Sequence, residues 1–165
     1  MKECTYLPLP DAEKTVSLLI DKGWHISFAE SCTGGMVAAA IVDVAGASAA
    51  FNESFVTYSN QAKIKRLGVS ADTVGEHGVV SEPVVSEMAR GVAEVTDSQV
   101  GVAVSGIAGP GGGTPKKPVG TVCFGFFVNG DTYTFTKHFE NMDRHSVRQA
   151  SVDFVYSFLT EILDR

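Results

Sequence analysis

The sequence predicts an α/β protein, a single-domain three-layer α/β/α sandwich built around a mixed sheet. Its 165 residues are 44% apolar and 19% charged, the composition of one globular domain with a substantial core. Segments with helical periodicity alternate with short apolar, strand-like runs along the chain. Two such runs near the C-terminus meet at Asn129-Gly130, a dipeptide typical of a tight antiparallel hairpin. No repeat, low-complexity tract or linker divides the chain, so one domain is expected over residues 1–165.

Each element follows from local signals. The first helix is predicted over residues 11–22, with Asp11 as its N-cap and Gly23 as its stop. Further helices are predicted at 32–44, 62–67, 81–95 and 143–163, the last with an apolar face of Val147, Ala150, Phe154, Phe158 and Ile162. Strands rich in β-branched and aromatic residues are predicted at 24–30, 51–60, 99–109, 119–130 and 131–140.

Charge and cysteine content argue against several classes of protein. The net charge is −6 and no basic stripe is present, so a nucleic-acid partner is not expected. Cys4, Cys32 and Cys123 are odd in number and form no CxxC pair, which argues against a disulfide framework and a zinc site and favours the cytoplasm. The N-terminus has no signal-like apolar run. The longest apolar stretch is interrupted by Asp43 and Gly46, so no membrane span is expected.

The stretch AESCTGG, residues 29–35, concentrates reactive side chains where a strand leads into a helix. The first turn of that helix is expected to hold Thr33, Gly34 and Gly35, whose N–H groups would be free to hold an oxyanion. Ser31 is then a candidate nucleophile, but the stretch taken alone favours a simple helix cap at Ser31 or Thr33. Cys32 is a third candidate.

A serine nucleophile needs a base, and the histidines offer no recognisable triad. Lys63 lies where a predicted strand gives way to a helix, and a buried lysine loses its proton more readily than an exposed one. It is a candidate base, with a solvated helix lysine as the alternative. Lys65 and Arg66 are expected to be the exposed members of the same run.

A second glycine-rich segment, SGIAGPGGGTPKKPVGTV (105–122), follows an apolar strand. It matches neither a Walker A loop nor a dinucleotide fingerprint, since Gly109 and Gly111 fit the first two positions but Thr114 occupies the third. Its N–H groups could still hold a monophosphate, the alternative being a flexible loop between strands. Arg144 opposes the dipole of the last helix at its start, which indicates a ligand-binding or a surface arginine.

Together AESCTGG, VTYSNQAKIKRLGV (56–69) and the 105–122 segment resemble the three signature blocks of the CinA C-terminal domain, the nicotinamide-nucleotide amidohydrolase family. The resemblance runs in the same order over residues 10–163. It implies hydrolysis of the carboxamide of nicotinamide mononucleotide to nicotinate mononucleotide and ammonia, in pyridine nucleotide recycling, without metal or cofactor. Many relatives carry an additional N-terminal domain. The 165 residues are too few to include it, so the chain is expected to resemble the stand-alone enzyme.

Residue roles are carried over from the same resemblance. Ser31 is implied as the nucleophile and Lys63 as its base. Ser105 stands where relatives often have Thr, and Ala45 where Pro is frequent. Further positions implied around the site, or in its phosphate loop, are Thr33, Ser48, Tyr58, Gly106, Gly109, Gly111 and Arg144.

The expected partner is a small-molecule nucleotide, and a homodimer is expected because relatives tend to self-associate. An amidase that uses Cys32 and a non-catalytic nucleotide-binding or regulatory module remain as alternatives.

Overall fold

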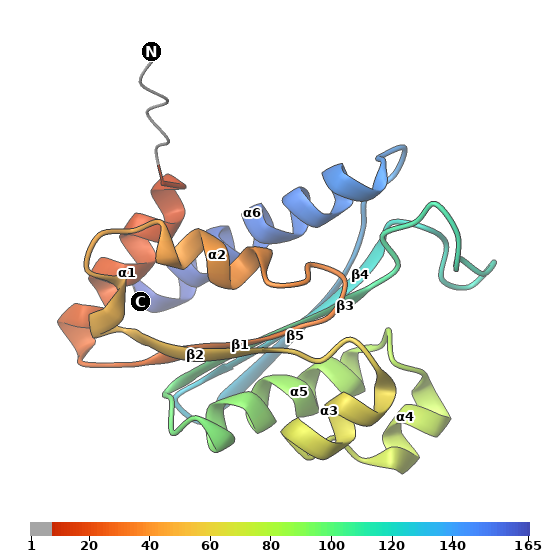
Figure 1. Ribbon diagram of the computed structural model, residues 1–165, viewed down its shortest axis with the longest axis horizontal. Coiled ribbons are helices and arrows are strands. Elements are labelled where there is room, and N and C mark those ends of the chain that lie inside the picture. The colour runs from red at the N-terminus through yellow and green to blue at the C-terminus, as the bar shows by residue number, and fades with distance from the viewer. Residues whose placement is uncertain (1–7) are drawn as a thin grey trace.

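A computed structural model describes residues 8–165 and shows three layers, with helices on both faces of a five-stranded sheet (Figure 1). The α/β class and its mixed sheet, predicted from the sequence, are confirmed. The strands are β1 (Ile26–Glu30), β2 (Phe51–Val56), β3 (Val100–Gly106), β4 (Thr121–Val128) and β5 (Asp131–His138). The α-helices are α1 (Pro10–Lys22), α2 (Met36–Val42), α3 (Asn60–Leu67), α4 (Ala71–His77), α5 (Glu82–Val95) and α6 (Arg144–Leu163), with a 3-10 turn at Ala47–Ala49.

The sheet has the order β2-β1-β3-β4-β5. β1 is parallel to both β2 and β3, whereas β3, β4 and β5 are antiparallel neighbours. Because β1, β2 and β3 are parallel, their carboxyl ends meet at one edge of the sheet, the usual place for a ligand in an open α/β fold. The hairpin at Asn129-Gly130 forms as predicted.

Side chains that alternate along the strands build a separate apolar core on each face of the sheet. On one face Phe28, Val104 and Phe124 pack with α1, α2 and α6. On the other face Ala29, Ala103 and Cys123 pack with α5, where Val84, Met88 and Val92 are fully buried. The small side chains of this second core let α5 lie close against the sheet.

Three helix starts differ from the predictions, and α3 begins at Asn60 rather than at residue 62. The N-cap position of α1 is Leu9, and Asp11 lies inside the first turn, because Pro10 already begins the helix. The helix predicted from residue 32 begins only at Met36, because Gly34 and Gly35 have φ angles of +61° and +99°. These left-handed conformations make residues 31–35 a tight loop rather than a first helical turn.

The remaining differences concern what the helices bury. Helix α4 was not predicted; it is short and has no buried residue, so the sequence carries no apolar periodicity there. In α6, Ala150 is only partly buried, while Ser151, Val155, Tyr156 and Leu159 are buried beyond the predicted face. The buried arc is wide because α6 packs against α1 and α2 as well as the sheet.

Candidate functional site

Three segments singled out in the sequence meet where the parallel strands end. Ser31 follows β1, and its N–H continues the sheet by donating to the Val104 carbonyl of β3 (2.9 Å). Thr57 follows β2, and its N–H donates to the Glu30 carbonyl (2.8 Å). The glycine-rich loop follows β3 at the same edge. The parallel pairing therefore brings together residues that are far apart in the sequence.

Lys63 lies beside Ser31 at this edge. Its Nζ is 3.2 Å from the Ser31 Oγ and donates to the carbonyl oxygens of Thr57 (2.7 Å) and Tyr58 (3.4 Å). The hydroxyl of Ser59 caps the start of helix α3, which points Lys63 and Leu67 inward. The Lys63 side chain is only 1% exposed, whereas Lys65 and Arg66 are exposed as predicted.

Burial lowers the pKa of the Lys63 amine below its ordinary value, because the charged form loses its hydration. The described residues place no carboxylate within ion-pair distance of this amine to hold it charged. A neutral amine within hydrogen-bond reach of a hydroxyl is the arrangement that a serine nucleophile and its general base require.

The carboxylate of Glu30 fills the start of α2. This buried side chain accepts the N–H groups of Gly35 (2.9 Å), Val37 (3.2 Å) and Ala38 (2.8 Å). It thus satisfies donors that a short helix leaves unpaired. The N–H of Gly35, expected to be free for an oxyanion, is therefore engaged.

Arg148 holds the same loop from the side of α6. Its Nε donates to the Cys32 carbonyl (3.0 Å), and its second terminal nitrogen donates to the Thr33 carbonyl (2.9 Å). Neither Arg148 nor Glu30 was singled out as a site residue from the sequence. The four-residue spacing from Arg144 and the acid that ends an apolar strand were the only signals, and both are common in sequences.

The buried side-chain hydroxyls of Thr33 and Thr57, close in sequence to Ser31 and Lys63, have no hydrogen-bond partner within residues 8–165. Their side chains are 0% and 1% exposed. Buried polar groups are normally satisfied, so these two have capacity for a water or a ligand. For Thr33, this agrees with the role implied by the family resemblance.

Cys32 points the other way, into the core shared with α2 and α6. Burial raises the pKa of its thiol to about 12. The thiolate is the reactive form of cysteine, so this thiol is a poor nucleophile near neutral pH.

Arg144 joins two other predicted site residues. Its guanidinium donates to the Gly109 carbonyl (2.7 Å) and to the Tyr58 hydroxyl (3.3 Å), and both arginine and tyrosine are exposed. The glycine-rich loop, Tyr58 and the start of α6 are thereby linked across the mouth of the site.

Two of the three predicted loop glycines are required by the packing. A Cβ on Gly106 would lie 2.7 Å from Val122 Cγ2, and a Cβ on Gly109 would lie 2.5 Å from Val119 Cγ1. Gly109 also has a φ of +85°. Gly111 is exposed with nothing within 4 Å of a Cβ, so the fold places no demand on it.

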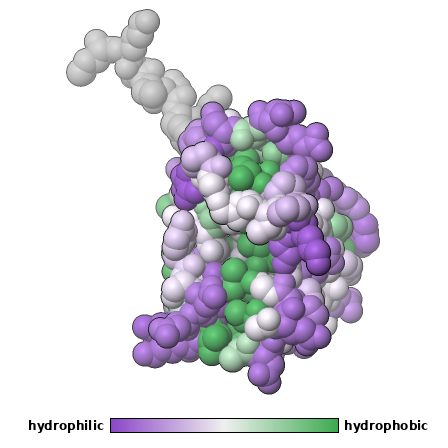
Figure 2. Space-filling model, turned by 90° about the vertical axis from the view of Figure 1, so that its right-hand side faces the viewer, coloured by the Kyte–Doolittle hydropathy of each residue, from purple (hydrophilic) through white to green (hydrophobic). Residues whose placement is uncertain are grey.

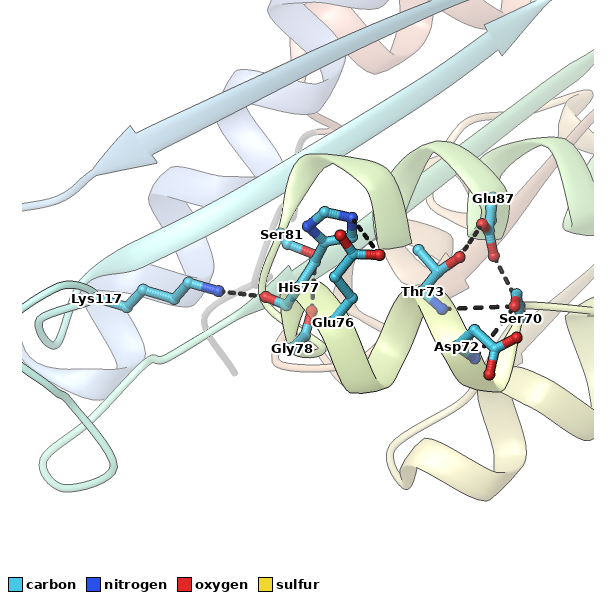
Figure 3. A network of polar contacts seen from close by, with 9 residues as sticks. All are labelled: Ser70, Asp72, Thr73, Glu76, His77, Gly78, Ser81, Glu87 and Lys117. Carbon is cyan, nitrogen blue, oxygen red and sulfur yellow. Dashed lines mark hydrogen bonds and ion pairs between the residues drawn. The ribbon is translucent and has the colours of Figure 1, made fainter.

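The far part of the loop is tied to α4 (Figure 3). Lys117 donates to the His77 carbonyl at the end of α4 (2.8 Å). Glu87 of α5 accepts from the Ser70 N–H (2.7 Å) and the Thr73 hydroxyl (2.6 Å) at the start of α4. The unpredicted helix therefore connects the loop to the body of the protein.

The other two predicted serines are placed differently. Ser105, near the end of β3, is buried and donates to the Val79 carbonyl (2.8 Å). Ser48 is exposed in the turn before β2, and Phe51 at the start of β2 pairs with Ile26 at the start of β1. The structure does not bring Ser48 to Ser31, because they flank opposite ends of strands that are roughly 16 Å long.

The loop-bearing end of the molecule, at the right of Figure 1, faces the viewer in Figure 2. A band of hydrophobic residues runs down this face between hydrophilic borders.

A separate groove of about 390 Å³ lies near the start of α1, lined by Leu9, Met36 and Asp43 among others, and includes none of the predicted site residues. Within residues 8–165 no group of three metal-ligating side chains occurs, and no helix is long and apolar enough to cross a membrane.

Fold and site together define an α/β protein with a serine beside a buried lysine at the carboxyl edge of a mixed sheet. The model of the CinA C-terminal domain family matches residues 10–163. The chain belongs to this family, as the sequence resemblance predicted.

Individual proteins with similar sequences support this family membership. The nicotinamide-nucleotide amidohydrolase PncC of Enterobacter agglomerans is 52% identical over 144 residues, which are 86% of this chain and 87% of that protein. The CinA-like protein of Kosmotoga olearia is 47% identical over 92% of this chain, which spans only 36% of that longer protein.

Among solved structures, a CinA superfamily protein of Klebsiella pneumoniae has a TM-score of 0.89 and 36% identity, covering 93% of this chain and 96% of that one. The competence/damage inducible protein CihA of Agrobacterium tumefaciens has a TM-score of 0.88 and 36% identity, covering 98% of this chain and 100% of that one.

Proposed function

We propose that this protein hydrolyses the carboxamide of nicotinamide mononucleotide to nicotinate mononucleotide and ammonia, with Ser31 as nucleophile and Lys63 as base. The observation that carries the proposal is the 3.2 Å separation of the Ser31 Oγ from the Nζ of a buried lysine. The substrate is inferred from the nicotinamide-nucleotide amidohydrolase of Enterobacter agglomerans, which aligns with 86% of this chain.

The mechanism follows from the pair. Neutral Lys63 accepts the Ser31 proton as the Oγ attacks the carboxamide carbon, and the carbonyl oxygen becomes an oxyanion held by backbone N–H groups. The C–N bond then breaks, and Lys63 returns the proton to the leaving nitrogen, which departs as ammonia. Water, deprotonated by Lys63, attacks the acyl ester and releases nicotinate mononucleotide and free Ser31.

The phosphate end of the nucleotide would lie at the mouth of the site. Arg144 is exposed there and already contacts the glycine-rich loop and Tyr58. Its guanidinium suits a phosphate, and loop N–H groups would add to the binding. We place the reaction in the recycling of pyridine nucleotides in the cytoplasm, with no metal or cofactor.

Ammonia release from nicotinamide mononucleotide tests the proposal directly. Ser31→Ala and Lys63→Met should each lower kcat by roughly 10³-fold or more, as loss of a nucleophile or its base does. Lys65→Met is the matched control, because Lys65 is an exposed lysine on the same helix, and it should keep kcat. Near-full activity of Lys63→Met would sink the serine–lysine pair. Tight nucleotide binding without ammonia release by the wild type would support a non-catalytic binding module instead.

A further inference from the structure

Of the backbone N–H groups from Ser31 to Ala38, all but two donate a hydrogen bond to an oxygen atom. Ser31 donates to Val104, Gly34 to the Ser31 carbonyl (3.2 Å) and Met36 to the Thr33 carbonyl (3.3 Å). Glu30 accepts those of Gly35, Val37 and Ala38. Within the described chain, the N–H groups of Cys32 and Thr33 have no oxygen or nitrogen acceptor, and only the weakly accepting thiol of Cys32 lies near them. They directly follow the proposed nucleophile.

Arg148 fixes the peptide plane that carries the Thr33 donor directly, and the plane that carries the Cys32 donor through Gly34. A trans peptide points its C=O and N–H in opposite directions. The Cys32 carbonyl and the Thr33 N–H belong to one such plane, and Arg148 holds that carbonyl at 3.0 Å. Its second bond, to the Thr33 carbonyl at 2.9 Å, fixes the next plane, which carries the Gly34 N–H. The Gly34 N–H in turn holds the Ser31 carbonyl, and the peptide plane of that carbonyl carries the Cys32 N–H. The planar guanidinium sets both at once, which a lysine cannot do.

We infer that Arg148 is a positioning residue that holds the nucleophile loop so that the N–H groups of Cys32 and Thr33 form the oxyanion site. The inference rests on the proposed amide hydrolysis and specifies which donors serve it. It replaces the expectation that the helix start from Thr33 to Gly35 supplies them, since Glu30 already occupies the Gly35 N–H.

The fold does not depend on Arg148 to hold α6 against α2. The buried Tyr156 hydroxyl donates to the Val37 carbonyl (2.6 Å), and Val147 and Val155 of α6 are fully buried in the same core. Loss of the guanidinium therefore frees the loop while the two helices stay packed, so a catalytic effect can be separated from unfolding.

The test compares Arg148→Met and Arg148→Lys with the wild type, with Arg90→Met as a control. Arg90 is an exposed arginine that contacts Phe127 and Thr132, at the opposite end of β4 and β5. Arg148→Met should lower kcat by about 10²–10³-fold, the cost of losing an oxyanion donor, with KM within about twofold. The kcat of Arg148→Lys should lie between that of Arg148→Met and that of the wild type. Added guanidinium ion at tens of millimolar should restore part of the kcat of Arg148→Met but not of Lys63→Met.

A second readout requires no turnover. Pyridine-3-boronic acid forms a tetrahedral adduct with a reactive serine, and its affinity should fall in Arg148→Met by a factor similar to that for kcat. Nicotinamide mononucleotide binding to Ser31→Ala should not change when Arg148→Met is added. A rise in KM with kcat unchanged would overturn the inference, as would boronate affinity equal to that of the wild type. If the wild type binds the boronate but releases no ammonia from the nucleotide, the proposed substrate fails while the role of Arg148 is still measured.

Discussion

At the scale of single residues, the burial of Lys63 determines how the protein should respond to pH. Desolvation lowers the pKa of this amine from its ordinary 10.5, and only the neutral amine can accept the Ser31 proton. We expect kcat/KM for ammonia release to rise with pH and to level off below 10.5. Lys63→Arg should be inactive throughout, because a guanidinium stays protonated. A rate that falls as pH rises toward 10.5 would contradict a lysine base.

The same group links pH to stability. Between the lowered native pKa and about 10.5, the unfolded chain holds a proton that the native chain lacks, so the free energy of unfolding rises with pH there. Below the native pKa both states hold the proton, and the contribution is constant. Urea denaturation should therefore show wild type gaining stability relative to Lys63→Met between neutral and alkaline pH.

The thiol beside the nucleophile should be dispensable. Cys32 is buried with a pKa of about 12, so little thiolate exists at pH 8. Cys32→Ala should keep kcat within about twofold and lower the free energy of unfolding by about 1 kcal/mol through the lost packing. Peptide mapping after treatment of the native protein with iodoacetamide should find Cys32 unmodified. Alkylation of Cys32 in parallel with inactivation would instead support the cysteine amidase.

Residue types were visible in the sequence, but their surroundings were not. Ser31 and Lys63 were named as candidates, with a helix cap and a solvated lysine as the alternatives, and the sequence could show neither the burial of Lys63 nor its 3.2 Å separation from Ser31. Glu30 and Arg148 were missed because their roles consist of contacts with backbone groups, and such contacts leave no spacing pattern in the chain.

At the scale of elements, glycine packing positions the helix that carries Lys63. A Cβ on Gly91 of α5 would lie 1.9 Å from the Leu67 carbonyl oxygen at the end of α3. Gly91→Ala should therefore push α3 away, lower the free energy of unfolding by about 1–3 kcal/mol and reduce kcat. Denaturation and ammonia release measure the two effects.

Gly75 provides the matched control for that prediction. It lies within α4, with nothing within 4 Å of a Cβ. Gly75→Ala should raise the free energy of unfolding by up to about 1 kcal/mol, because alanine favours the helix and restricts the unfolded chain. Stabilisation by both substitutions would show that α3 and α5 do not pack this closely.

Helices and strands with strong local signals were predicted well, and weak ones were not. The Asn129-Gly130 hairpin and α5 with Pro83 in its first turn form as expected. The start of α2 was placed too early, since periodicity does not reveal that Gly34 and Gly35 adopt positive φ angles. α4 lacks a buried face altogether.

At the scale of the whole molecule, the site exists because three parallel strands end together. The sequence predicted a mixed sheet but not the order β2-β1-β3-β4-β5, because strand order depends on pairing between distant segments. That order alone brings the residues after β1, β2 and β3 to one edge. It also separates Ser48 from them, which the family resemblance did not reveal.

The expected homodimer would use the β2 edge of the sheet. The apolar face of α6 is buried within the chain. β2 and β5 are both edge strands among the described residues, but of the two only β2 exposes a large apolar side chain, Val56 (53%). We expect a dimer in sedimentation velocity and its loss in Val56→Lys. Val95→Lys, at an exposed apolar position at the end of α5, should leave it intact. A monomeric wild type at high concentration would contradict the dimer.

The buried carboxylate of Glu30 should favour one orientation of the substrate in the site. A phosphate approaching the start of α2 would find its donors engaged and a negative charge behind them, whereas Arg144 offers a cation at the mouth. We therefore expect the proposed substrate, with an uncharged amide at one end and a phosphate dianion at the other, to bind in a single orientation, amide first. Inorganic phosphate, which has no uncharged end, should compete only for the mouth and never reach the serine.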